Sequence, residues 1–316
     1  MQGRFTRAVC SLMIEVLQRV LRFCACMLVV VPNTLLHATP LLILAVFKVC
    51  LPIPRWRRRL SHWLIVIAQS WIAVNSWVIA RMTPARLRID GELAQLQPQG
   101  WYLVLCNHQS WVDILVLQAM FNRRIPFLKF FLKAELIWVP VLGLAWWALD
   151  FPFMRRYSRE TLRKHPEWRG KDIEATRKAC EKFRDLPVSV MNFVEGTRYT
   201  AAKHAGQQSP YPNLLQPRAG GVAFVMETMG DMLQAVVDVT LVYSGRRPTL
   251  FDLLSGQVKE IHADVRQRTI PADLLGGDYE NDSEYRARFQ AWINGLWAEK
   301  EARIMAMRAT SVSSPS

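Results

Sequence analysis

The chain has 316 residues, of which 51% are apolar and 12 are tryptophan, and its formal net charge is +14. Residues 1–100 hold 12 Lys and Arg against 3 Asp and Glu, so most of the positive excess surrounds two long uncharged stretches there. This distribution favours anionic lipid head groups over nucleic acid, for which no recognition motif is found. The six cysteines have no zinc or redox spacing, and the sequence shows no metal-ligand cluster.

The two uncharged stretches predict a membrane anchor over residues 1–82. Residues 23–47 and 60–80 each exceed the roughly 20 apolar residues that cross a hydrocarbon core. Pro32 and Pro40 should kink the first segment or fold it back near its middle, and the tryptophans of the second suit an interfacial helix. Basic residues lie before, between and after the segments. We therefore expect an anchor in one leaflet, or one span and one interfacial helix, rather than two full spans.

From residue 83 onwards, short apolar runs alternate with helical patterns, which is typical of an α/β fold whose mixed, largely parallel sheet is flanked by helices. Strands are expected at 101–106, 125–132, 188–196 and 233–243, and helices at 111–121, 171–185, 219–230 and 284–306. Residues 136–154 should form a short helix, a turn and a strand. We therefore expect a core at 83–245, a C-terminal extension at 246–306 that ends in a helix, and a disordered tail at 307–316.

The first polar strand end is N-H-Q-S-W-V-D at 107–113, and it follows the apolar run at 101–106. Ligands of open α/β sheets bind beyond the carboxyl ends of strands. Asp113 can reach His108 across the turn, fix one imidazole nitrogen and leave the other free as a general base. Ser110 and Asp113 are also spaced like a helix capping box, which would need no histidine. The residues alone leave both interpretations open.

The second polar strand end is Glu195-Gly196-Thr197-Arg198. A guanidinium next to a hydroxyl and a flexible backbone suits the oxygens of a phosphate group. A solvated loop with one salt bridge would have the same composition. The sequence contains no G-x-S-x-G, Walker, G-x-G-x-x-G or H-E-x-x-H motif, which leaves these two strand ends as the candidate site.

Together the two strand ends resemble the N-H-x-x-x-x-D and F-P-E-G-T-R blocks of the PlsC-type glycerophospholipid acyltransferases. The two blocks lie 87 residues apart, in the family's order. Two further segments are similar to other blocks of that family, namely F-L-K-A-E-L-I-W-V-P-V-L-G at 131–143 and A-V-V-D-V-T-L-V-Y at 235–243. The pair of motifs is specific where either motif alone is not.

Several departures from the family pattern favour its lysocardiolipin-acyltransferase branch and the bacterial relatives of that branch. In the G-x-x-F-I-D-R block, Asp150 replaces the glycine and Arg155 the aspartate. Val194 replaces the proline of F-P-E-G-T-R, and Asp238 stands where many members have proline. Residues 157–187 form a long insert before the second polar strand end.

The resemblance implies a membrane-bound O-acyltransferase, of the class that transfers acyl groups other than aminoacyl groups. It would move an acyl chain from acyl-CoA or acyl carrier protein to the free hydroxyl of lysophosphatidic acid or a similar lysophospholipid. His108 would be the general base and Asp113 would orient it. Arg198 and Arg156 would hold the acceptor phosphate together with Thr197 and the Gly196 amide. Glu195 would position the loop or a glycerol hydroxyl, and Lys133 would lie near the thioester oxygen.

By the same resemblance, the thioester is a co-substrate, and no metal or cofactor is implied. The expected partners are membrane lipids with anionic head groups and the acidic acyl carrier protein. The expected location is the bacterial inner membrane, with the catalytic part facing the cytoplasm. Two other functions stay open, namely a lysophospholipid hydrolase that uses the same dyad to activate water and a non-catalytic membrane scaffold. The head group, the acyl chain and the oligomeric state are not predicted.

Overall fold

The structure of the chain, a computed structural model, describes residues 2–51, 53–154, 183 and 186–312. Arg155, Arg156 and, apart from Phe183, the helix expected at 171–185 lie outside the described residues. Most of the insert at 157–187 lies outside them as well.

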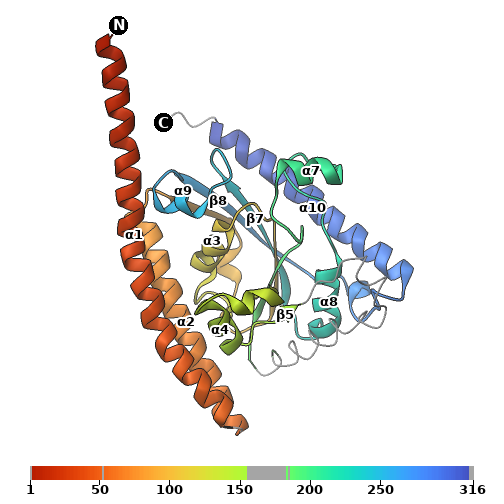
Figure 1. Cartoon of the computed structure of the whole chain (residues 1–316). Coiled ribbons are helices and arrows are strands. Elements are labelled where there is room, and N and C mark those ends of the chain that lie inside the picture. The colour runs from red at the N-terminus through yellow and green to blue at the C-terminus, as the bar shows by residue number, and fades with distance from the viewer. Residues whose placement is uncertain (1, 52, 155–182, 184–185, 313–316) are drawn as a thin grey trace, which may run out of the picture.

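Six strands form one mixed sheet that lies at the centre of the molecule (Figure 1). The strands are, in spatial order, β1 (Arg86–Gly91), β8 (Glu260–Arg268), β7 (Ala235–Tyr243), β2 (Tyr102–Cys106), β6 (Ser189–Phe193) and β3 (Leu128–Phe130). The four strands β7, β2, β6 and β3 are parallel to one another, whereas β8 is antiparallel to β7 and parallel to β1. The predicted α/β fold with a largely parallel sheet is confirmed.

Helices cover both faces of the sheet, and the two faces carry different apolar clusters. In β2, Val104 and Cys106 point into the first cluster, whereas Leu103 and Leu105 point into the second. This division follows from the two-residue repeat of a strand. All five residues of β2 are buried, as expected for a parallel strand covered on both faces. The central strand is therefore rigidly held, and so is the polar segment that follows it.

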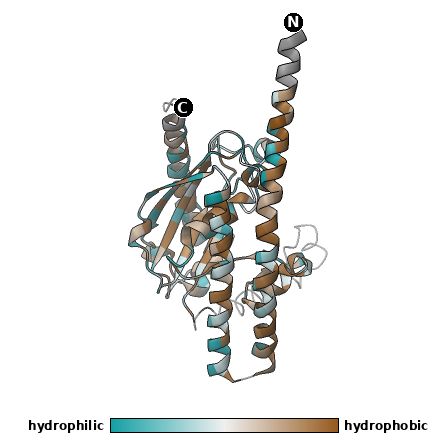
Figure 2. Ribbon diagram, turned by 90° about the vertical axis from the view of Figure 1, so that its left-hand side faces the viewer, coloured by the Kyte–Doolittle hydropathy of each residue, from teal (hydrophilic) through white to brown (hydrophobic). Residues whose placement is uncertain are grey.

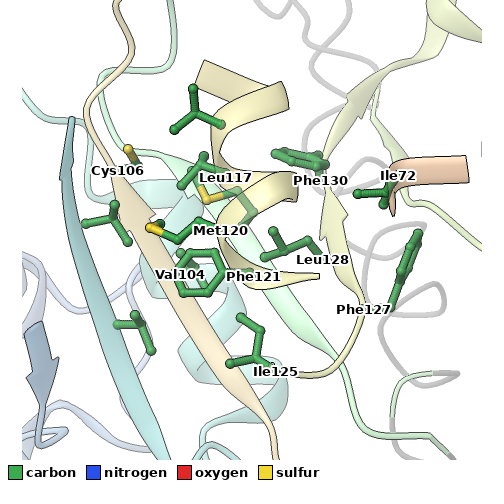
Figure 3. Close-up of a cluster of buried hydrophobic side chains, with 14 of the residues drawn as sticks. Ile72, Val104, Cys106, Leu117, Met120, Phe121, Ile125, Phe127, Leu128 and Phe130 are labelled. Carbon is green, nitrogen blue, oxygen red and sulfur yellow. The ribbon is translucent and has the colours of Figure 1, made fainter. Parts of the chain in front are cut away.

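The first cluster joins the helices α2 (Pro54–Met82) and α3 (Val112–Phe121) to the sheet. Figure 3 shows Phe121 at the end of α3 next to Val104 of β2, and Ile72 of α2 on the side of Phe127 and Phe130. The second cluster lies on the other face, under α8 and α10, and includes Phe289 and Trp297 of α10. The remaining elements are α4 (Leu142–Ala148), α7 (Ala201–Gln207), α8 (Gly220–Met229), α9 (Leu250–Leu254), α10 (Ser283–Val312), the pair β4 (Leu132–Lys133) and β5 (Phe153–Met154), and 3₁₀ helices at Leu93–Gln95, Ala134–Trp138 and Ala272–Leu274.

The C-terminal helix is longer than predicted. α10 runs from Ser283 to Val312, so the expectation of a disordered tail from residue 307 is wrong up to Val312. Met307 packs against the second cluster, and Arg308 donates a hydrogen bond to the side-chain oxygen of Asn213. These contacts, together with the helix-favouring Ala-Met-Arg-Ala sequence at 306–309, extend the helix.

Two long N-terminal helices, α1 (Gln2–Cys50) and α2 (Pro54–Met82), are both long and apolar enough to cross a membrane. Of the two predicted effects of the prolines, a kink or a fold-back, the fold-back is wrong, because α1 continues through Pro32 and Pro40. Polar contacts hold the proline-containing part of α1 against α2. Asn33 donates to Asn75 (2.9 Å), and the indole of Trp71 donates to the Thr34 hydroxyl (3.1 Å).

α1 also contacts the core at two points, near its middle and near its C-terminal end. Arg22 donates to the carbonyl oxygen of Ser255 (3.4 Å), and Lys48 donates to that of Ala148 (3.1 Å) and to Asp150. Asp150 has a φ of 57°, in the left-handed region that aspartate tolerates better than most residues, which explains how it can replace the family's glycine. The helix pair therefore lies alongside the core with a largely apolar outer surface (Figure 2), which includes Leu28 and Leu36.

Candidate active site

The two polar strand ends meet at one edge of the sheet. β2 and β6 are neighbouring parallel strands with Cys106 opposite Phe193, so the segments that follow them leave the sheet side by side. The backbone joins them, since the Tyr199 amide donates to the carbonyl oxygen of His108 (2.8 Å). The amide of His108 also faces the carboxyl oxygen Oε1 of Glu195, at 3.5 Å.

His108 and Asp113 form the predicted dyad geometry. The distance from His108 Nδ1 to Asp113 Oδ2 is 2.8 Å, and the Asp113 side chain is fully buried. The imidazole also stacks on the Phe193 ring, with centroids 3.8 Å apart and an interplanar angle of 12°. Nδ1–H of His108 donates a hydrogen bond to the carboxylate, and the stacking fixes the plane of the ring. This arrangement leaves Nε2 for a substrate.

Asp113 is itself held by three further donors. Its Oδ2 accepts from the amides of Gln109 (2.6 Å) and Ser110 (2.9 Å), and its Oδ1 accepts from the Tyr243 hydroxyl (2.6 Å). The Ser110 hydroxyl in turn accepts from the Val112 amide (3.0 Å). Half of the predicted capping box is therefore present, because Asp113 accepts from the Ser110 amide, whereas the Asp113 amide donates to the carbonyl oxygen of Ser110 and not to its hydroxyl. The same carboxylate also faces His108.

Glu195 is buried at the inner end of the second motif, with 1% of its surface exposed. Within the described part of the chain, its second carboxyl oxygen has no hydrogen-bond partner. Burial raises the pKa of Glu195 to about 8, against the opposing effect of the His108 amide. The carboxyl group is therefore mostly protonated at neutral pH, and it can donate as well as accept a hydrogen bond.

The rest of the E-G-T-R loop lies at the rim of the site. Gly196 takes a φ of 68°, in the left-handed region, and its amide donates to Phe193 O (2.8 Å) to close the turn. The guanidinium of Arg198 lies over the indole of Trp111, 4.5 Å from the ring centroid. Trp111 is 55% exposed, so Arg198 sits at the surface directly beside the first motif. A fixed cation at the open side of the dyad is suited to an anionic substrate group.

Comparisons with known proteins agree with the family resemblance predicted from the two motifs. Residues 88–244 match the family model described as Acyltransferase, a range that contains both motifs. The chain carries an acyltransferase domain. It is 30% identical over 213 residues to the 1-acyl-sn-glycerol-3-phosphate acyltransferase delta of Mus musculus, covering 63% of this chain and 51% of that protein. It is 29% identical over 195 residues to the 1-acyl-sn-glycerol-3-phosphate acyltransferase 3 of Arabidopsis thaliana, covering 57% of this chain and 49% of that protein.

The chain thus spans about half the length of the curated relatives it matches. Among solved structures, the 1-acyl-sn-glycerophosphate (LPA) acyltransferase PlsC from Thermotoga maritima aligns with a TM-score of 0.45 and 15% identity, over 88% of this chain and 98% of that one. The predicted resemblance to the acyltransferase family is confirmed. The lysocardiolipin-acyltransferase branch stays a prediction.

The departure at Asp238 has a structural explanation within the acyltransferase domain. Asp238 is buried in the middle of β7, and α10 brings two cations to it. The Lys300 ammonium, fully buried, donates to Asp238 (2.5 Å) and to Val239 O (2.6 Å), and Arg303 donates to the other carboxylate oxygen. The C-terminal helix therefore supplies the partners that a buried carboxylate requires.

For two of the predicted site residues, the described part of the chain shows no contact with either motif. Lys133 is exposed and belongs to the separate pair β4–β5, and Arg156 lies outside the described residues. Other residues of the acyltransferase domain were missed by the sequence reasoning. Tyr243 donates to Asp113, and the Phe193 ring stacks on His108. Lys203 donates to the Thr197 hydroxyl (2.7 Å). Tyr243 is the last residue of the predicted strand at 233–243, and Phe193 lies within the predicted strand at 188–196, which was the available signal.

Proposed function

We propose that the chain is a membrane-bound O-acyltransferase that transfers an acyl group from a thioester to the free hydroxyl of a lysophospholipid, with lysophosphatidic acid as the acceptor. The observation that carries the proposal is the His108–Asp113 contact of 2.8 Å, with Nε2 left for a substrate beside a loop that ends in Arg198. The names of the relatives, which act on 1-acyl-sn-glycerol 3-phosphate, support this acceptor.

In the proposed reaction, Nε2 of His108 removes the proton from the acceptor hydroxyl as its oxygen attacks the thioester carbonyl carbon. The carbon–oxygen bond forms, the carbon–sulfur bond breaks, and the imidazolium returns the proton to the departing thiolate. Asp113 keeps the Nδ1 proton in place and stabilises the charged ring. General base catalysis of this kind contributes about 10²–10⁴-fold to a rate.

The E-G-T-R loop would bind the acceptor. Arg198 would hold its phosphate, assisted by the Thr197 hydroxyl, because a planar guanidinium matches two phosphate oxygens at once. The Gly196 amide donates to Phe193 O and would shape the turn rather than bind the phosphate. Glu195, which is mostly neutral at pH 7, would hydrogen-bond a glycerol oxygen or fix the loop through the His108 amide.

The helix pair α1–α2 suits a protein whose acceptor and product both reside in a bilayer. α1 contacts the core through Arg22 near its middle and through Lys48 near its C-terminal end, so the core lies along the C-terminal half of this helix. This arrangement supports an anchor that lies in one leaflet. The basic N-terminal region would face anionic head groups at about 1 kcal/mol per basic side chain, and it would also suit an acidic acyl carrier protein as donor. We place the enzyme at the bacterial inner membrane with its site towards the cytoplasm.

The test compares two variants with labelled acyl-CoA and a panel of lysophospholipids. His108→Ala should abolish transfer with folding intact, whereas Arg198→Ala should mainly raise the KM for the phosphate-bearing acceptor. Release of free fatty acid from the lysolipid, without a thioester donor, would favour the hydrolase. Unchanged transfer in folded His108→Ala protein would remove the catalytic role of the dyad.

A further inference from the structure

A third strand end reaches the same edge of the sheet and carries a cation outside both motifs. β7 is parallel to β2 and lies beside it on the side opposite β6. The loop that follows β7 is fastened to the first motif at two points, since the Tyr243 hydroxyl donates to Asp113 and the Ser110 hydroxyl donates to the carbonyl oxygen of Pro248. Arg247 lies between these two points.

The Arg247 side chain lies against Tyr199, directly beside the second motif. Its guanidinium lies 3.5 Å from the centroid of the Tyr199 ring, and the Tyr199 amide bonds the carbonyl oxygen of His108. Burial lowers the pKa of this guanidinium, and the neighbouring Tyr199 and Glu195 counteract that shift. Arg247 thus contacts the residue that directly follows Arg198, on the side of the motif nearer β7.

The donor capacity of Arg247 is incompletely used. Its Nε is buried and, among the described residues, has no hydrogen-bond partner. A buried donor without a partner is destabilising, so such a group in a site is suited to a ligand that accepts its hydrogen bond. The neighbouring Arg246 differs, because its side chain is 74% exposed and pairs with Asp252 at the start of α9.

We propose that Arg247 binds an anionic phosphate oxygen of a substrate, so that the site holds phosphate between Arg198 from the β6 end and Arg247 from the β7 end. This inference rests on the proposed acyl transfer, and it adds a binding residue from a third strand. The phosphate belongs either to the lysophospholipid acceptor or to the CoA moiety of the donor. A phosphate held by two guanidinium groups gains charge-assisted hydrogen bonds from each.

The first experiment measures steady-state kinetics of Arg247→Ala, Arg247→Lys and the matched control Arg246→Ala in the full-length protein. KM is measured for lysophosphatidic acid in one arm and for acyl-CoA in the other. Arg247→Ala should raise one of the two KM values about 10- to 100-fold and change kcat by less than about threefold. Arg247→Lys should recover part of the loss, because it keeps the charge but not the planar fork. Arg246→Ala should match the wild type.

The second experiment measures equilibrium binding of labelled lysophosphatidic acid and of CoA, with every variant in the His108→Ala background, so that no turnover is needed. Weaker binding of one ligand in the Arg247→Ala protein supports the inference, even if the wild type transfers no acyl group and the proposed function fails. Wild-type affinity for both ligands would overturn the inference. So would an equal rise of both KM values, since that would indicate a loop that is merely disordered.

Discussion

Replacing Asp113 by asparagine separates the chemistry of the dyad from the folding of the turn. In the folded protein Oδ2 of Asp113 accepts from His108 and from two backbone amides, and Oδ1 accepts from the Tyr243 hydroxyl. An asparagine can place its oxygen at the Oδ2 position and its amide group towards Tyr243, whose hydroxyl can rotate and accept. All four contacts are then kept, while the negative charge beside the imidazole is lost.

The structure sets the size of the two expected effects. With its hydrogen bonds preserved, Asp113→Asn should lower the free energy of unfolding by no more than about 1–2 kcal/mol. The loss of charge stabilisation for the protonated His108 should lower kcat by about 10²–10⁴-fold, and a 10³-fold loss corresponds to about 4 kcal/mol. Asp113→Ala would instead leave the two backbone amides and the Tyr243 hydroxyl, all buried, without an acceptor, at about 1–3 kcal/mol each. A loss of activity in that variant would then not be distinguishable from unfolding.

The assay measures kcat for formation of the diacyl product from lysophosphatidic acid and a long-chain acyl-CoA, and urea unfolding of the same preparations. Tyr243→Phe is the matched control, because it removes one of the four donors and leaves the His108–Asp113 contact in place. It should cost about 0.5–1.5 kcal/mol of stability and much less activity. A folded Asp113→Asn protein that keeps more than about a tenth of the wild-type kcat would refute the role given to the carboxylate.

Two further substitutions, Glu195→Gln and Lys300→Met, test how buried ionisable groups contribute to stability. Because the pKa of Glu195 rises from its ordinary 4.5 to about 8 on folding, the folded state retains a proton that the unfolded state loses, so the stability falls as the pH rises through this range, by at most about 5 kcal/mol. Glu195→Gln should flatten this dependence in urea unfolding, and an identical slope in both proteins would contradict the assignment. Lys300→Met should lower the free energy of unfolding by about 3 kcal/mol, because Asp238 loses a buried partner, whereas Arg288→Met at an exposed position of α10 should change little. Equal effects of the two substitutions on the urea midpoint would argue against the buried charge cluster.

The sequence predicted the site well where its signal was local. The apolar runs before His108 and Glu195 are buried strands, and strand ends of a parallel sheet meet at one edge, which brings the two motifs together. The spacing of Ser110 and Asp113 predicted a capped helix, and the spacing of His108 and Asp113 predicted a dyad. The structure contains the dyad and the carboxylate half of the cap, because Oδ2 of Asp113 accepts from the His108 imidazole and also from the Ser110 amide.

Contacts between residues that lie far apart in the sequence could not be predicted from local sequence patterns. Tyr243 lies 130 residues after Asp113, and only the sheet order places β7 next to β2. The edge strand β1 and its neighbour β8 were not predicted, although Ile261, Ala263 and Val265 of β8 are buried with the two-residue period of a strand. Asp238 was recognised only as a departure from a family pattern, since its partners lie on α10, more than sixty residues further on.

The most direct test of the account is the transfer reaction itself, measured with purified full-length protein in mixed micelles of lysophosphatidic acid. The protein should convert this lipid and labelled acyl-CoA into phosphatidic acid, with one thiol released for each acyl group transferred, and His108→Ala should show no transfer while unfolding like the wild type. Thiol release without new phosphatidic acid, or equal transfer by the folded His108→Ala variant, would contradict the proposal that this strand end catalyses acyl transfer to a lysophospholipid.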